Sequence, residues 1–148
     1  MSALTASHED FKKEYLAVLE GVPPQNGVLE DLLYHDKNKN KTYVVKRERR
    51  GVKKAKLAYD LLETITNDDQ TFSLVKVRLY TGRTHQIRVQ FASRGFPIAG
   101  DRRYGASAGE SGIYLFSHKI EIVSPFDGKP MSFSALPERS GAWAHFSI

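Results

Sequence analysis

The chain of 148 residues contains no cysteine, which excludes disulfides, thiolate metal sites and a cysteine nucleophile. It also lacks a run of about 20 apolar residues, the length that a membrane-spanning helix requires. Its first residues do not form a basic stretch followed by an apolar block, so no secretory signal is visible. We therefore expect a cytoplasmic protein.

Length and composition indicate one folded domain. Domains commonly have about 100–200 residues, so residues 1–148 are expected to form a single domain. Hydrophobic residues make up 41% of the chain and charged residues 26%. These fractions are close to those of globular proteins and exclude a wholly disordered or fibrous chain.

Positive charge is concentrated in one segment. The net charge is +5, but ten basic residues lie between Lys37 and Lys56 with Glu48 as the only acid among them. The rest of the chain carries 12 basic and 16 acidic residues. This asymmetry indicates an anionic partner, most commonly nucleic acid. The alternative for the densest part, Lys46 to Lys56, is a solvated, mobile loop, and the pattern alone favours neither.

Alternating and β-branched residues predict a sheet with hairpin connections. The predicted strands are Tyr15–Leu19, Val28–Tyr34, Thr42–Val45, Leu57–Thr66, Thr71–Tyr80, Tyr114–Val123 and Met131–Ala135. A short helix is expected after Ser7. Arg83–Ser93 is ambiguous, because its alternation favours a strand, whereas Thr84 as a cap and Gly95 as a stop allow a helix. The predicted fold class is α+β.

Four ordered motifs carry a resemblance to a known family. Thr81–Arg88 reads T-G-R-T-H-Q-I-R, and Gly95–Gly105 fits G-x-P-[IL]-x-G-D-x-x-Y-G. Lys13–Gly21 fits K-x-Y-x-A-x-x-x-G, and residues 115–118 with 124–125 fit L-x-[AS]-H and H-P, with Ser124 in place of the histidine. From Lys13 to Pro137 the chain thus resembles the RluA-type RNA pseudouridine synthases.

The resemblance implies a fold and an activity. The fold would be a mixed, mainly antiparallel sheet with few helices. The activity would be the isomerisation of uridine to pseudouridine in ribosomal or transfer RNA, without a metal or an organic cofactor. The histidines show no ligand spacing that would indicate a metal site.

One family motif does not occur in the chain. The catalytic aspartate of the family lies in H-R-L-D followed by T-S-G, and none of the aspartates here, Asp101 included, has that context. The resemblance implies that the motif would precede Met1, so the N-terminal part of the family fold would be missing. An incomplete sheet would favour self-association or a complementing chain. The alternative is a non-catalytic RNA-binding homologue.

The resemblance also assigns residues. Tyr15 would stack on the flipped uracil and take part in proton transfer, or it is an ordinary tyrosine of a core strand. Arg88 would pair with the catalytic aspartate, a role left without a partner here, or it is a solvated arginine on a helix face.

Further residues are candidates for contact with RNA. Arg83, His85 and Gln86 would orient the site or touch RNA, with structural hydrogen bonding as the alternative for His85 and Gln86. The basic candidates are Lys46, Arg47, Arg49, Arg50, Lys53, Lys54, Arg102 and Arg103. Trp143 and Phe146 are expected to pack against the body of the protein.

Overall fold

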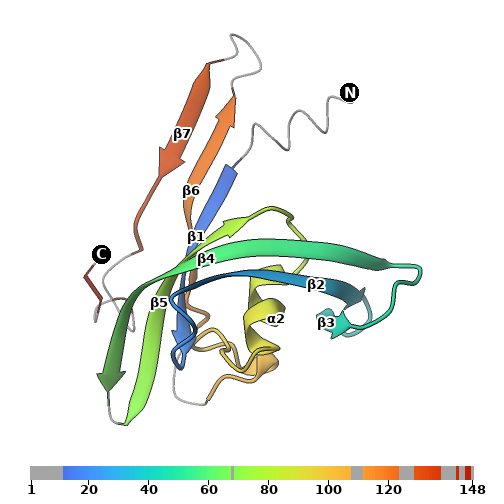
Figure 1. Cartoon of the computed structure of the whole chain (residues 1–148), viewed down its shortest axis with the longest axis horizontal. Helices are drawn as coiled ribbons and strands as arrows, with labels where there is room; N and C mark the ends of the chain where they lie inside the picture. Colours follow the sequence, from blue (N-terminus) through green and yellow to red (C-terminus); the bar gives the residue numbers. More distant parts are fainter. Residues whose placement is uncertain are drawn as a thin grey trace.

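A computed structural model describes residues 12–67, 69–107, 112–123, 129–137, 143, 146 and 147. The helix expected after Ser7 lies outside these residues. In this part of the chain the sheet has seven strands in the order β3-β2-β4-β5-β1-β6-β7, and every neighbouring pair is antiparallel (Figure 1). The strands are β1 Lys12–Glu20, β2 Asn26–Asp36, β3 Lys41–Val45, β4 Val52–Asn67, β5 Gln70–Leu79, β6 Leu115–Val123 and β7 Pro130–Ser134.

Helix is scarce in the described residues. They include one α-helix, α2 (Gln86–Ala92), and one turn of 3-10 helix, η1 (Arg102–Tyr104). None of the described helices has the length and apolar character needed to cross a membrane. A large antiparallel sheet with little helix confirms the predicted α+β class.

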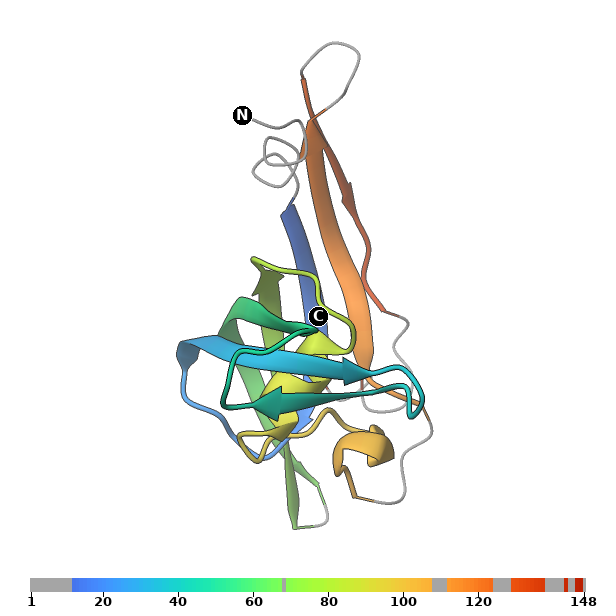
Figure 2. The ribbon, with the colours of Figure 1, turned by 90° about the vertical axis from the view of Figure 1, so that its right-hand side faces the viewer.

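The strand β5 lies in the middle of the sheet and is buried on both faces. Phe72 and Leu74 pack with the β1 residues Leu16 and Val18 on one face. Val75 belongs to the core cluster of the other face, which α2 covers (Figure 1). Both views show β6 and β7 extending beyond the rest of the sheet (Figure 2).

Trp143 and Phe146 close the face opposite α2. Their side chains are 8% and 1% exposed and join the cluster that contains Leu16 and Leu74. The rings of Tyr114 and Phe116 meet Trp143 edge to face. The expectation that Trp143 and Phe146 pack against the body is therefore confirmed.

The ambiguous segment before Gly95 is a helix. Ile87 and Phe91, one turn apart, pack into the core beneath the sheet, while Val89 packs with Leu33 toward β2. Because the short helix is buried on more than one side, its apolar residues also alternate, which produced the strand-like pattern. The helix begins after His85, not after Thr84, and His85 has a left-handed backbone with φ of 55°.

Part of the basic run is strand and not loop. β4 begins at Val52, five residues earlier than predicted, and Lys53 and Lys54 pair with Leu33 and Leu32 of β2. The mobile-loop alternative is therefore wrong for Val52 to Lys56. Strand geometry points Lys53 and Lys54 to opposite faces of the sheet, which decides what each can contact.

Candidate active site

A hollow of ≈ 220 Å³ lies between β1, the ends of β5 and β6, and the start of α2. Tyr15 of β1 and Arg88 of α2, the two residues assigned catalytic roles, both line it, and Leu79 and Leu115 give it apolar walls. Arg83, His85 and Gln86 line it as well. The structure thus brings the K-x-Y and G-R-T-H-Q-I-R motifs to one place.

Register explains the position of Tyr15. It pairs with Val77 of β5 and Ser117 of β6, and the register toward β6 shifts between Glu14 and Tyr15. Tyr15 shares the face of the sheet that α2 covers, and it packs at the edge of the core cluster containing Ile87. Its ring is half-buried, so it serves as part of the core and as part of the wall of the hollow.

Arg88 has a carboxylate partner in the described structure. Its Nε and Nη2 donate to Oδ2 and Oδ1 of Asp101 at 2.8 and 3.0 Å. The Asp101 side chain is 1% exposed and that of Arg88 17%. These hydrogen bonds raise the pKa of Arg88. The alternative of a solvated arginine is therefore wrong, because Asp101 of the G-D-x-x-Y-G stretch binds Arg88 in a largely buried pair.

Tyr104 connects Arg88 with the edge strand β3. The Arg88 guanidinium carbon lies 4.9 Å from the centre of the Tyr104 ring, within the range of cation–π attraction. The Tyr104 hydroxyl accepts the backbone N–H of Thr42 at 2.9 Å and is 2.7 Å from Nδ1 of His85. Tyr104 was missed as a site residue, although its position in the same motif as Asp101 could have indicated it.

Thr42 and His35 extend this network. The Thr42 hydroxyl donates to the carbonyl of Thr84 at 2.9 Å and lies 2.9 Å from Nδ1 of His35. The rings of His35 and His85 meet edge to face at 5.8 Å. These contacts join β2 and β3 to the loop before α2, and no sequence motif marks Thr42.

The surroundings of His85 favour the neutral form of its ring. Burial lowers its pKa below the ordinary value of 6.5, and the positive charge of Arg88 lowers this pKa further, while the carboxylate of Asp101 acts in the opposite direction. A neutral ring accepts a hydrogen bond at Nδ1, and the Tyr104 hydroxyl is free to donate there because it accepts from Thr42. His85 therefore acts as an acceptor that orients Tyr104 beneath Arg88.

This lowered pKa predicts a pH-dependent stability. Below the ordinary pKa of 6.5 the unfolded chain binds a proton at His85 that the folded chain does not, so the free energy of unfolding falls as the pH falls through this window. Urea unfolding at several pH values should show a shallower fall in His85→Gln than in the wild type. His118→Gln controls for the loss of a histidine elsewhere. An unchanged pH profile in His85→Gln would contradict the assignment.

The contacts of Gln86 fit structural hydrogen bonding, the alternative to a contact with RNA. Its side chain is buried, and Oε1 accepts from the Thr81 hydroxyl at 2.8 Å and from the backbone of Arg83 at 2.9 Å. Its Nε2 donates to the carbonyl of Lys56 at 3.1 Å. Gln86 therefore fastens the loop before α2 to β4.

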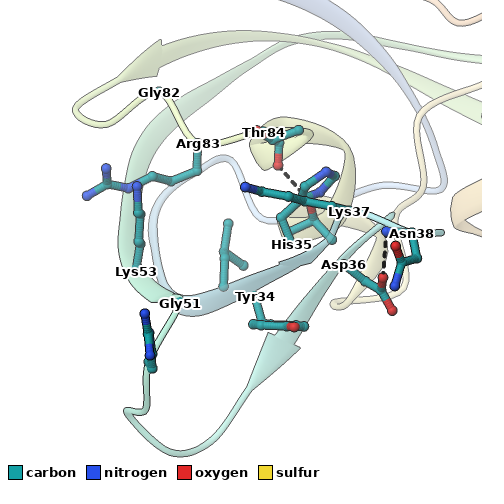
Figure 3. Close-up of a pocket in the computed structure, with 13 residues that line it drawn as sticks. Tyr34, His35, Asp36, Lys37, Asn38, Gly51, Lys53, Gly82, Arg83 and Thr84 are labelled. Atoms are coloured by element: carbon teal, nitrogen blue, oxygen red, sulfur yellow. Dashed lines mark hydrogen bonds between the residues drawn. The ribbon is translucent and has the colours of Figure 1, made fainter. Parts of the chain in front are cut away.

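The basic RNA-contact candidates do not form one surface. Arg50, Lys53 and Arg83 line a second hollow of ≈ 790 Å³ between the β2–β3 turn, the start of β4 and the loop before α2 (Figure 3). Lys46 and Lys54 line a different hollow. The others are exposed: Arg47, Arg49, Arg102 and Arg103.

The chain resembles known RNA-modifying proteins in sequence. The sequence model of the RNA pseudouridylate synthase family matches residues 1–93. An RNA pseudouridine synthase of Chloroflexus aurantiacus is 33% identical over 84% of the chain and 38% of its own length. The ribosomal large subunit pseudouridine synthase D of Borreliella burgdorferi is 35% identical over 86% of the chain and 38% of its own length. The chain thus spans less than half of either relative.

Solved structures show the same fold. Human RNA pseudouridylate synthase domain containing 1 superposes with a TM-score of 0.73 at 21% identity, over 97% of this chain and 64% of that one. Human RNA pseudouridylate synthase domain containing 4 gives 0.70 at 20% identity, over 96% and 62%. The described sheet with its single α-helix is therefore the arrangement of pseudouridylate synthase domains.

Proposed function

Because this chain belongs to the RNA pseudouridylate synthase family, we propose that it forms the uracil-binding part of a pseudouridine synthase site. The substrate is a uridine of ribosomal or transfer RNA in the cytoplasm. The observation that carries the proposal is the 220 Å³ hollow in which Tyr15, apolar walls and the fixed guanidinium of Arg88 meet. The 148 residues act as one domain.

The hollow suits a flipped pyrimidine. A base must leave its stack before its glycosidic bond can be cleaved, and enzymes stack such a base against aromatic and apolar side chains. The Tyr15 ring offers the aromatic face, and Leu79 and Leu115 the apolar walls. We assign base stacking to Tyr15 and proton transfer to its hydroxyl.

Arg88 is arranged to hold a second carboxylate. Asp101 occupies Nε and Nη2, and Nη1 has no hydrogen-bond partner among the described residues. A guanidinium in hydrogen-bond contact with a carboxylate keeps that carboxylate ionised and fixes its orientation. In our proposal Arg88 positions the nucleophilic aspartate, while Asp101 positions Arg88.

No H-R-L-D motif occurs in the 148 residues, and in our proposal none of their aspartates is the nucleophile. We propose that it comes from a further segment of the same protein or from a second chain. This absence also supports a second candidate function, RNA binding without catalysis. The two candidates make opposite predictions for turnover by the native protein.

The test uses native protein captured from its cells with an antibody to this chain. We expect it to form pseudouridine on an unmodified ribosomal RNA transcript, measured by mass spectrometry of the digested nucleosides. Its intact mass should exceed 16.7 kDa or a second chain should be present. RNA binding without pseudouridine on ribosomal and transfer RNA would overturn the catalytic proposal in favour of the binding function.

Variants made in the native gene locate the activity. Tyr15→Leu keeps an apolar side chain but removes the ring, and base stacking contributes about 1–3 kcal/mol per base. We therefore expect the lost stacking to lower kcat/KM about 5- to 150-fold, and the loss of the hydroxyl assigned to proton transfer to lower it further. Tyr43→Leu, which removes a tyrosine of β3 outside this hollow, should retain the wild-type rate. Equal rates for Tyr15→Leu and the wild type would contradict the stacking role.

A further inference from the structure

The second hollow, which we call the β2–β4 hollow, is the one of ≈ 790 Å³ lined by basic residues of several segments. Lys37 comes from the β2–β3 turn and Arg83 from the loop before α2. Arg50 lies in the turn before β4, and Lys53 lies at the start of β4. Figure 3 shows Lys37 extending toward the loop that carries Arg83 and Thr84, with Arg83 near Lys53. Four cations from three segments of the chain therefore surround one concavity.

These cations have little negative charge near them. Asp36 is the one acidic residue among those lining the hollow, and its Oδ1 already accepts the backbone N–H groups of Asn38 and Lys39 at 3.0 and 3.2 Å. Within the described residues no ion pair involves Lys37, Arg50 or Lys53. Like charges gathered without counter-charges destabilise a fold, so an anionic ligand would relieve their repulsion.

The opposite face of the same strands is neutralised. Lys54 pairs with Glu48 at 3.8 Å. Lys56 pairs with Glu30 at 3.6 Å. The hollow on that face is lined by Glu30 together with its lysines, while strand alternation turns Asp31 to the other face, where Arg94 binds it at 2.7 Å. The basic run thus has one unbalanced face and one balanced face, separated by strand alternation.

Arg83 connects the β2–β4 hollow with the 220 Å³ hollow, because it lines both. Its Nε donates to the carbonyl of Lys54 at 2.8 Å, which fixes the guanidinium beside β4. A ligand that occupies both hollows must therefore pass Arg83. The two hollows lie on the face of the sheet that α2 covers, since Tyr15 shares that face with α2 and Lys53 pairs with Leu33, which packs toward Val89.

We propose that the β2–β4 hollow binds a single-stranded RNA segment adjoining the target uridine, with its phosphates on Lys37, Arg50, Lys53 and Arg83. This inference rests on the proposed uracil site. A base in an already single-stranded segment costs least to flip out, and the volume of this hollow lies within the usual range of ligand pockets. A groove of cations that follows the backbone is the usual electrostatic device for single strands.

The test measures binding of the full 148-residue chain to a fluorescent oligouridylate of about ten nucleotides. Anisotropy is followed between about 50 and 200 mM salt. Each phosphate contact on a single strand contributes about 0.7 to the slope of log K against log salt, so K37A/R50A/K53A should lower that slope by about 2. The matched variant K46A/K54A/K56A, which removes three cations of the balanced face, should keep the wild-type slope.

Two further measurements complete the design. K37R/R50K/K53R keeps the charges and should keep the slope, which separates loss of charge from loss of fold. A duplex of equal length should bind more weakly than the single strand. Equal losses in the two triple-alanine variants, or tighter binding of the duplex, would overturn the inference. If the wild type binds RNA and K37A/R50A/K53A binds equally well, the hollow is excluded while the proposed uracil site stands, because Tyr15→Leu tests that site separately.

Discussion

Replacing Asp101 by alanine should lower the free energy of unfolding by about 3–5 kcal/mol, the usual cost of leaving one member of a buried ion pair without its partner. The carboxylate is 1% exposed and is bound by Arg88 through two hydrogen bonds of 2.8 and 3.0 Å. Without it, the guanidinium stays beneath the Tyr104 ring with its charge uncompensated. Urea unfolding measures the loss directly.

A second ion pair provides the control. Lys54 and Glu48 are 3.8 Å apart with side chains 82% and 69% exposed, and exposed pairs contribute about 0–1 kcal/mol. Glu48→Ala should therefore change stability little. The double variant Arg88→Met with Asp101→Leu removes both charges and should recover part of the loss. A cost for Asp101→Ala as small as that for Glu48→Ala would show that the pair does not hold the site together.

The sequence allowed the strands, but not their full extent, to be predicted. The Leu57–Thr66 and Thr71–Tyr80 hairpin was correct, because the turn-forming residues between its strands and the β-rich flanks agree. β4 was predicted too short because Lys53, Lys54 and Lys56 have weak β propensity. Pairing with β2 overrides that preference, and such long-range pairing is not visible in a local pattern.

The candidate site was predictable where a motif marked it, and not elsewhere. Tyr15 and Arg88 lie 73 positions apart in the chain and meet in one hollow, which only a motif resemblance could indicate. Asp101 was set aside because its context did not fit a nucleophile, and its role as the partner of Arg88 was not foreseen. Thr42 contacts Tyr104 through its backbone N–H, a group that every residue except proline carries and that leaves no signature in the sequence.

Gly100 precedes Asp101 and fixes where it lies. The preceding residue, Ala99, is hydrogen-bonded on both sides. Its N–H donates to the carbonyl of Val18 at 2.8 Å, and its carbonyl accepts from the N–H of Tyr114 at 3.1 Å. Gly100 has φ of +83°, which other residues adopt only with strain. An added methyl group would overlap the carbonyl oxygen of Gly112. Relief of this overlap requires a shift of the Gly112 backbone or of Gly100 itself.

Gly100→Ala should therefore cost about 3 kcal/mol or more, because overpacking and left-handed strain act together. The same change should also weaken the Arg88 pair, because Asp101 must move with the backbone. Gly82→Ala is the matched control: nothing lies within 4 Å of its added methyl group, so its unfolding midpoint should stay near that of the wild type. Thermal and urea unfolding measure the stability of both variants relative to the wild type. Equal stability of Gly100→Ala and Gly82→Ala would mean that the Gly112 segment yields freely and that Gly100 does not fix the position of Asp101.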